Sequence, residues 1–361
     1  MTPVGPGLLA GTAVSGLVVL LLVAVATAHV SRTHRQARDA RRRAALTPLV
    51  LALLDDEDGD DQDGRSSRVG VTTAPALLDD VVLGLLPQLR GGDREALQQV
   101  LTARGVVDRA AADLGARAAW RRGRAATLLG ATGSRAHTAQ LTALLGDRDP
   151  EVRCVAARAL GKCGDPSVVP SLLGALSTEP PLPAGVVGMA LLDLGTAALP
   201  ALRTALDADG SAAQAVAAEL LGLHGDLAVS AVLEALVRDP DRPVSVRRAA
   251  AGALGRLGSP SATDVLVRAL VSPPLAATAA EALGRIGDPL ALTALVAGMA
   301  VAEPEARAAC ANALAALGPD GREALAAAAA EPHATGSAAH AARAALDALA
   351  VRPRRTQTSS R

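Results

Sequence analysis

The sequence lacks phenylalanine and tyrosine entirely and has a single tryptophan, Trp120, although half of its residues are hydrophobic. A packed interior must therefore be built from Ala, Leu and Val, and small side chains bury little apolar area each. This composition disfavours a compact core with large anchors and favours a large array of closely packed helices. Runs of alternating residues typical of half-buried strands are missing, so we expect an all-α fold.

Lysine is nearly absent too, because Lys162 is the only one and arginine carries the rest of the positive charge. Together with the excess of alanine, this indicates a GC-rich bacterial genome. The formal net charge is zero, which points to no class of partner. Proteins that stack nucleic-acid bases add aromatic platforms. A nucleic-acid partner is therefore not expected, although arginines cluster between Arg104 and Arg124.

Motifs for catalysis and metal binding are missing as well. None of the six histidines is followed by glutamate, and HExxH, CxxC, GxSxG and the phosphate-binding GxxxxGK motif with a following Ser or Thr do not occur. Cys154, Cys163 and Cys310 are odd in number and lack metal-type spacing, which favours small core residues in a reducing cytosol. We therefore expect no catalytic residue, no cofactor and no metal, in a protein that is not an enzyme.

The first thirty residues predict a membrane anchor. Residues 8–28 form a run of 21 uncharged residues, close to the roughly 20 that cross a bilayer. Six arginines follow between Arg32 and Arg43, and no charged side chain precedes the run. The positive-inside rule then predicts a single-pass protein of the cell (inner) membrane, with residues 1–30 as anchor, the N-terminus outside and the remainder cytoplasmic. The alternative is a signal peptide cleaved after Ala28, which the long apolar run and the following arginines disfavour.

Residues 31–70 are predicted to be a basic juxtamembrane segment and an acidic, disordered linker. Seven of the nine residues from Asp55 to Asp63 are acidic, and no register among them matches the ligand positions of an EF-hand loop. A solvated spacer is the simpler interpretation. We interpret residues 71–120 as a helical N-terminal cap, residues 121–350 as a repeat array and residues 351–361 as a disordered basic tail.

The strongest pattern is the repeat. A glycine closes a short Ala/Leu helix every 29 to 33 residues, in strings such as ALGKCGDP at 159–166 and ALGRIGDP at 282–289. Glycine adopts the left-handed conformation that ends a helix at little cost, and a following Ser, Asp or Thr can cap the next helix. The predicted structural caps are Gly133, Gly164, Gly195, Gly225, Gly258, Gly287 and Gly318.

A second break, such as Asp149-Pro150 or Glu303-Pro304, ends the first helix of each pair. One such hairpin cannot bury its own apolar stripe, so neighbours must stack. The sequence predicts about seven to eight hairpins, with Trp120 as a core anchor of the first or, alternatively, as a contact residue. Residues 183–189 lack a Val-Arg pair such as Val152-Arg153 or Val246-Arg247, which predicts a bend or a contact site there.

The string DRDPEVRCVAARALGKCGDP at 147–166 resembles HEAT-like repeats of the phycobilisome-lyase type, and the resemblance covers about two thirds of the chain. It implies an α-solenoid in which the second helix of each pair lines the concave surface. The implied partner-binding residues lie three positions before each Leu-Gly type helix ending, where Thr127 and Gly252 also fall. They are Arg158, Met189, Glu219, Glu281 and Asn312.

The same resemblance implies a ladder in which arginines near the start of the second helices pair with acids of the turns. The arginines are Arg153, Arg247 and Arg307, and the acids are Asp149, Asp239 and Glu303.

The sequence therefore predicts a membrane-tethered scaffold, an α-solenoid of HEAT-like hairpins preceded by one transmembrane helix, that binds another protein. Resemblance to bacterial membrane-anchored HEAT-like proteins implies a membrane enzyme, such as a glycosyltransferase, as the partner. A lyase-like enzyme or enzyme subunit related to the chromophore lyases is the alternative. Such an enzyme would need a groove with convergent polar groups for its ligand.

Overall fold

The computed structural model describes residues 81–88, 91–207, 211–330 and 336–351, and all regular elements among them are helical. The predicted anchor at residues 8–28, the segment 31–70, residues 71–80 of the cap and residues 352–361 of the tail lie outside the described residues. The chain divides into two compact units, residues 1–112 and residues 113–361.

In the described part of the first unit, a helix runs to residue 85 and continues as the 3-10 turn η1 (Leu86–Gln88). Two α-helices follow, α4 (Gly92–Ala103) and α5 (Val106–Asp113), and α5 ends at the unit boundary. Leu97 and Leu101 are spaced one helical turn apart and are both fully buried. Aliphatic side chains at helical spacing thus build this core without any aromatic residue.

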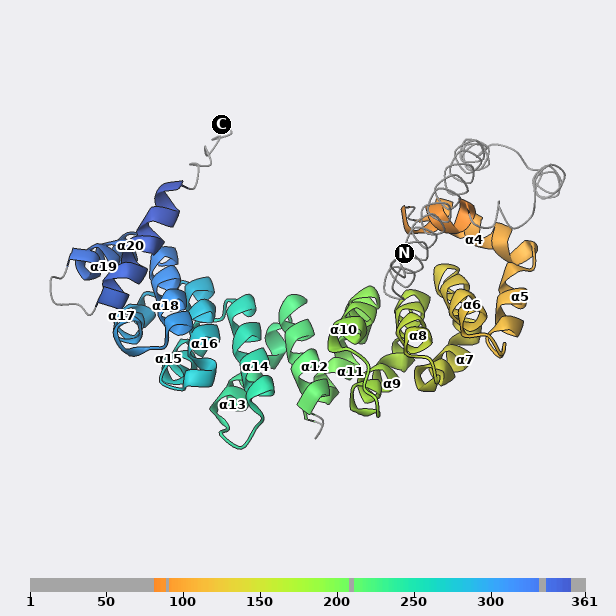
Figure 1. Cartoon of the computed structure of the whole chain (residues 1–361), viewed down its shortest axis with the longest axis horizontal. Coiled ribbons are helices and arrows are strands. Elements are labelled where there is room, and N and C mark those ends of the chain that lie inside the picture. The colour runs from red at the N-terminus through yellow and green to blue at the C-terminus, as the bar shows by residue number, and fades with distance from the viewer. Residues whose placement is uncertain (1–80, 89–90, 208–210, 331–335, 352–361) are drawn as a thin grey trace, which may run out of the picture. The chain divides into compact units, whose positions relative to one another are not determined.

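The second unit repeats one hairpin of a first and a second helix in chain order (Figure 1). The second helices are α6 (Ala119–Ala131), α8 (Pro150–Cys163), α10 (Ala184–Asp193), α12 (Ser211–Leu223), α14 (Val244–Leu257), α16 (Pro273–Ile286), α18 (Pro304–Ala316) and α20 (Gly336–Val351). The first helices are α7 (Thr138–Ala143), α9 (Val169–Gly174), α11 (Leu199–Leu206), α13 (Ser230–Arg238), α15 (Thr263–Ala269), α17 (Leu292–Val301) and α19 (Pro319–Ala330). The predicted all-α solenoid is therefore confirmed for the described residues.

Short 3-10 turns accompany the first helices. They are η2 (Arg135–His137), η3 (Leu144–Gly146), η4 (Pro166–Val168), η5 (Ala175–Ser177), η6 (Gly195–Ala198), η7 (Leu227–Val229), η8 (Pro260–Ala262) and η9 (Pro289–Ala291). The side chains of Asp165, Asp226 and Asp288 each accept a hydrogen bond from the backbone amide two residues further on. Ser134 and Ser259 make no such bond, so the prediction that serine caps the next helix is wrong at these two turns.

The seven glycines that close the second helices all have a positive φ, from 63° at Gly133 to 86° at Gly318. Among the described residues, no residue other than glycine has a positive φ. The C-cap of α8 at Gly164 has φ 69° and ψ 24°, which is the left-handed conformation. A side chain with a β-branch fits poorly there, so the break between the paired helices depends on glycine.

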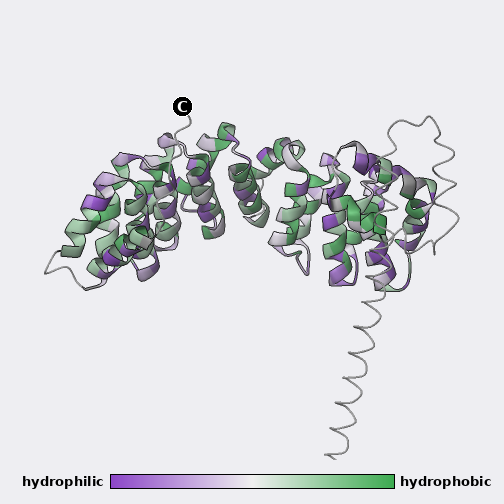
Figure 2. Ribbon diagram, turned by 90° about the horizontal axis from the view of Figure 1, so that it is seen from above, coloured by the Kyte–Doolittle hydropathy of each residue, from purple (hydrophilic) through white to green (hydrophobic). Residues whose placement is uncertain are grey.

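The buried positions are filled by alanine, valine and leucine, and Leu129, Leu160, Leu191 and Leu221 are completely buried. Figure 2 shows helices of the second unit that carry apolar and polar stretches side by side. Trp120, in contrast, is 69% exposed, so the prediction that it anchors the core is wrong. It lies at the start of α6, outside the set of residues that this helix buries.

By length and composition, no single helix among the described residues qualifies as a membrane span. One pair of consecutive helical segments, Ala184–Asp193 and Gly195–Leu206, would qualify only as a broken span, because the two are bent by 114°. Leu191 and Leu202 in this pair are fully buried within the protein.

Candidate functional site

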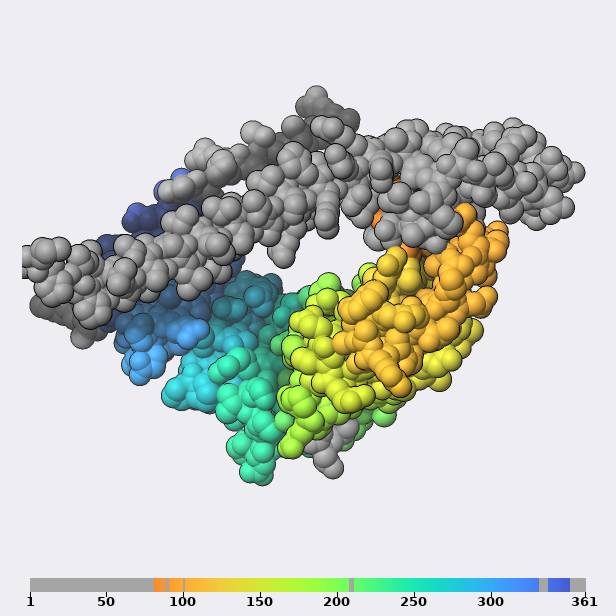
Figure 3. All heavy atoms as spheres, turned by 45° about the vertical axis from the view of Figure 1, so that its right-hand side comes forward, coloured from red at the N-terminus to blue at the C-terminus, as the bar shows by residue number. Residues whose placement is uncertain are grey.

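The second helices form the inner layer of the second unit. Consecutive second helices contact one another closely at most junctions, whereas consecutive first helices barely touch. A stack whose members approach more closely on one side curves toward that side. Figure 1 shows the even-numbered helices from α8 to α18 along the inner edge of this curve. Figure 3 shows the same hairpins as successive layers in chain order, from yellow to blue.

One position recurs on the exposed side of the second helices, which we call the inner face. The residues that occupy it in α6 to α18 are Thr127, Arg158, Met189, Glu219, Gly252, Glu281 and Asn312. All of them except Gly252 are exposed, and the apolar side chain of Met189 is 58% exposed. The candidate partner-binding residues therefore lie at equivalent places on successive helices. They form a surface and not a single convergent site.

Charged side chains cross this surface from α12 to α16. Arg256 Nη2 donates a hydrogen bond to the backbone oxygen of Glu219 at 3.4 Å, and Arg285 Nη2 lies 3.3 Å from Glu281 Oε2. Partial burial lowers the pKa of Arg256, with a smaller opposing effect from Glu219 and a further lowering by Arg285. Acidic and basic groups thus alternate along the inner face, which suits a partner that presents both signs of charge.

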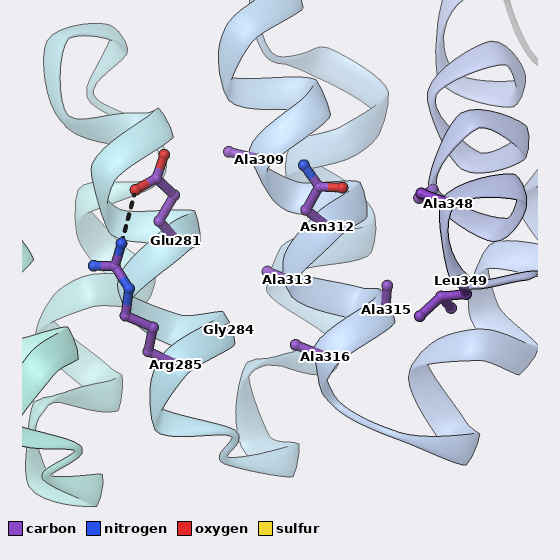
Figure 4. Close-up of a pocket in the computed structure, with 11 residues that line it drawn as sticks. Glu281, Gly284, Arg285, Ala309, Asn312, Ala313, Ala315, Ala316, Ala348 and Leu349 are labelled. Atoms are coloured by element: carbon purple, nitrogen blue, oxygen red, sulfur yellow. Dashed lines mark hydrogen bonds and ion pairs between the residues drawn. The ribbon is translucent and has the colours of Figure 1, made fainter. Parts of the chain in front are cut away.

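A groove of about 580 Å³ opens on the inner face between α16, α18 and α20. Glu281 and Arg285 line one side from α16, Asn312 lies on the middle helix, and Leu349 belongs to α20 on the other side (Figure 4). Most of the other lining residues are alanines. The groove therefore has a small-residue floor with a polar rim on the α16 side.

Five glycines bring neighbouring second helices into backbone contact. A Cβ atom on Gly161 would lie 2.4 Å from the backbone oxygen of Ala190. On Gly130, Gly222, Gly255 and Gly284 it would lie between 2.5 and 2.8 Å from the Cα atom of an alanine in the next second helix, respectively Ala159, Ala253, Ala282 and Ala313. Real Cβ atoms are not found at such distances. These contacts fix the spacing of the helices that carry the surface residues.

Sequence reasoning missed this role for the five glycines. The signal was present, because each lies three residues before a cap glycine, as Gly161 lies before Gly164. A glycine inside a helix costs stability relative to alanine, so its regular recurrence indicates a close approach of two backbones. The cap glycine alone accounts for a glycine in each string, so the packing role of the glycine three residues before it was not predicted.

The arginines near the start of the second helices bind backbone oxygens. Arg153 Nη1 donates to the oxygen of Asp147 at 3.1 Å, Arg247 Nε to that of Val237 at 3.1 Å, and Arg307 Nη2 to that of Ala302 at 2.7 Å. Carbonyl groups at the end of a helix lack partners within that helix and accept such donors. The arginines therefore tie each second helix to the end of the first helix before it.

The predicted ladder between these arginines and the turn acids is accordingly wrong. Asp149 instead caps α8 by accepting from the amide of Glu151 at 2.9 Å, and Asp239 pairs with Arg242 at 3.3 Å. Asp149 thus satisfies a local amide and Asp239 a neighbouring arginine, whereas Glu303 makes no side-chain hydrogen bond to the start of α18. The backbone oxygens lie within reach of the arginines and accept the hydrogen bonds that were predicted for the acids.

Arg122 makes the one well-buried ion pair among the described residues. Its Nε and Nη2 atoms both lie 2.7 Å from the carboxylate of Asp147, and the two side chains are 10% and 7% exposed. The hydrogen bond from Arg122 holds the pKa of Asp147 below its ordinary value, against the effect of burial. The pair joins α6 to the turn before α8 and is structural.

Among the described residues, no three His, Cys, Asp or Glu side chains come together in a group that could hold a metal ion. Cys163 and Cys310 are buried, and burial raises the pKa of each thiol to about 11. At neutral pH these thiols stay protonated, which makes them weak nucleophiles and poor ligands.

Residues 111–192 and 199–276 match the family model for HEAT repeats. The chain therefore carries HEAT-like repeats over most of the second unit. No curated protein sequence matches the chain.

Several solved structures are similar to this chain. Human deoxyhypusine hydroxylase in complex with glycerol is 22% identical, with 80% of this chain and 98% of that chain covered and a TM-score of 0.30. The complex of CpcE and CpcF of phycocyanin lyase from Nostoc sp. is 25% identical, with 67% and 94% covered and a TM-score of 0.33. Importin beta is 14% identical, with 81% and 46% covered and a TM-score of 0.48. These TM-scores lie below 0.5 and carry no argument about function.

Proposed function

We propose that the HEAT-like repeats of this chain form a scaffold that binds another protein along the inner face of its second helices. The observation that carries the proposal is the exposure of equivalent side chains on successive helices, from Arg158 on α8 to Asn312 on α18. The fold does not bury these side chains. On either side of the α10–α12 junction, backbone contacts fix the spacing of neighbouring second helices, so a partner would meet preorganised groups of helices.

The chemistry of the face favours a protein over a small ligand. Charges of both signs alternate from Glu219 to Arg285, and an exposed methionine, Met189, lies further along the same row. A stable protein complex covers about 800 Å² on each partner, an area that needs several neighbouring helices. Acidic, basic and apolar groups spread over a row of helices offer such an area with the polar and apolar contacts that protein interfaces combine.

We further propose that residues 8–28 tether the scaffold to the cell membrane, with the N-terminus outside and the repeats in the cytoplasm. The support is the sequence, namely the 21 uncharged residues and the six arginines that follow them. A tether raises the local concentration of the scaffold near partners in the same membrane. A membrane enzyme, such as a glycosyltransferase, is the partner that the resemblance to membrane-anchored HEAT-like proteins implies.

The partner proposal is tested by purifying the full chain in detergent from membranes of the cells that naturally produce it. We expect one protein to co-purify in a fixed ratio. It should be lost from a variant with Arg158, Glu219, Glu281 and Asn312 all changed to Ala. The matched control replaces an exposed ion pair of the outer layer, Asp264 and Arg268 on α15, and should retain the partner.

Retention of the same protein by the inner-face variant would overturn the proposal. A bound pigment or other small molecule in place of a protein would support the lyase-like alternative. The tether has a separate test, since deletion of residues 1–43 should move a folded repeat body from the membrane fraction to the soluble fraction. Continued sedimentation of the shortened chain with membranes would contradict a single anchor at residues 8–28.

A further inference from the structure

The junction between α10 and α12 lacks the glycine–alanine contact that joins five of the other six pairs of consecutive second helices. At five junctions a glycine of one helix lies against an alanine of the next, as Gly161 lies against Ala190. The glycine always stands three residues before the cap glycine of its own helix. The corresponding residue in α10 is Leu192, and the residue of α12 that corresponds to Ala190 is Leu220. Two leucines thus replace the glycine and the alanine.

The packing at this junction differs accordingly. Helices α10 and α12 share the sparsest contact of any two consecutive second helices in the described part of the chain, whereas α12 and α14 share the most extensive. The first helices on the outer side, α9 and α11, contact each other only lightly. Neither layer therefore supplies a broad contact across this boundary.

The two leucines, Leu192 and Leu220, account for the sparse packing. Helix axes lie about 8–10 Å apart, depending on the side chains at the contact. Glycine against alanine permits the lower end of this range, and leucine at both places requires the upper end. Leu220 is buried while Leu192 is partly exposed, as expected where the two helices do not close over both side chains. In an array of repeats each interface contributes its own share of stiffness and stability.

We propose that the α10–α12 junction is the bending joint of this solenoid. The helices from α6 to α10 move as one block, and those from α11 to α18 move as the other. Shear or hinge motion of packed blocks about a weak interface is a common form of conformational change. Met189 and Glu219 lie on opposite sides of the joint, so bending changes the distance between the two halves of the inner face. The inference does not depend on the proposed partner.

Electron–electron distance measurements between pairs of spin labels test the joint in the full chain. One pair, Arg158→Cys with Glu219→Cys, crosses the α10–α12 junction, and a second, Glu219→Cys with Glu281→Cys, lies within one block. Each pair spans two junctions, and the two pairs share one labelled site. Cys154 is changed to Ala in both, because it is the only cysteine that is not buried. We expect a broader distance distribution for the first pair, and equal widths would overturn the proposal.

Two reciprocal variants locate the flexibility. Leu192→Gly combined with Leu220→Ala restores the small pair, and it should narrow the Arg158–Glu219 distribution and shorten its mean by about 1–2 Å. Gly222→Ala introduces a Cβ 2.7 Å from the Cα atom of Ala253, and it should broaden the Glu219–Glu281 distribution alone.

Circular dichroism establishes that each variant is folded. If the double variant does not fold, Gly222→Ala still tests whether the glycine contacts set the stiffness of a junction. An unchanged Arg158–Glu219 width in a folded double variant would place the flexibility elsewhere. An unchanged Glu219–Glu281 width in Gly222→Ala would show that the glycine contacts do not set the stiffness.

Discussion

Two glycine-to-alanine changes on neighbouring second helices should have different effects on the free energy of unfolding. Gly161 on α8 and Gly188 on α10 both lie inside helices. A Cβ atom on Gly161 would meet the backbone of Ala190 at 2.4, 2.7 and 2.9 Å, and one on Gly188 would meet nothing within 4 Å. The same added methyl group therefore enters backbone at one site and open space at the other.

The expected magnitudes follow from two known effects. Alanine is more favourable than glycine inside a helix by about 0.8–1 kcal/mol, so Gly188→Ala should raise the free energy of unfolding by up to about 1 kcal/mol. Gly161→Ala has the same advantage, but the backbone of α10 must move away. Overpacking of a close contact costs typically about 1–3 kcal/mol, and backbone yields less readily than a flexible side chain. Gly161→Ala should therefore be neutral to destabilising by about 2 kcal/mol.

Urea denaturation of the full chain, followed by circular dichroism at the helix band, measures both variants against the unaltered protein. Repeat arrays do not always unfold in one step, so the comparison rests on the midpoint of the transition that both variants share. We expect the midpoint to rise for Gly188→Ala and to fall, or stay unchanged, for Gly161→Ala. Equal increases in both variants would refute the role of glycine in setting the spacing of the second helices.

Three further predictions concern the core, an ion pair and the thiols. Leu160→Ala removes a fully buried side chain of α8 and should lower the free energy of unfolding by about 2–5 kcal/mol. Arg158→Ala on the same helix should change it by less than about 0.5 kcal/mol, and similar urea midpoints for the two would contradict the register of α8. The pKa of Asp147 is lowered by Arg122 in the folded state, so the stability from this pair is present above the unfolded value of about 3.9 and lost as the pH falls through the lower folded value. Asp147→Asn should therefore lose less stability than the unaltered protein between about pH 5 and pH 2 in urea melts, and equal losses would exclude the pair as the cause. Because burial raises the pKa of Cys163 and Cys310 to about 11, a thiol reagent should react first with Cys154, and a fast reaction that persists in Cys154→Ala would show that the core is open.

The hairpin pattern could be predicted because one residue type meets one backbone requirement. Only glycine enters the left-handed conformation freely, and the seven cap glycines recur at nearly constant spacing. The exposure of Met189 and Glu281 follows from their common place on the second helices, once the register is known. Local chemistry therefore fixed the helix ends and, through them, the faces of the helices.

Trp120 and the arginines could not be predicted in this way, because their surroundings depend on packing between segments. Size alone suggested that Trp120 is buried, yet its position on α6 leaves it 69% exposed. Arg153 has both a turn acid and backbone oxygens within a few residues, and only the folded geometry selects the oxygen of Asp147. The unusual sequence of residues 183–189 predicted a bend or a contact site, but the two leucines at the α10–α12 junction became meaningful only beside the five glycine contacts.

Site-specific photo-crosslinking in living cells tests the proposed inner-face interaction most directly. A photoreactive amino acid replaces either Glu219 on the inner face or Arg268 on the outer layer of the full chain. We predict a discrete crosslinked protein species from position 219 and none from position 268. The same species from position 268 with equal yield, or from that position alone, would contradict an inner face that binds the partner.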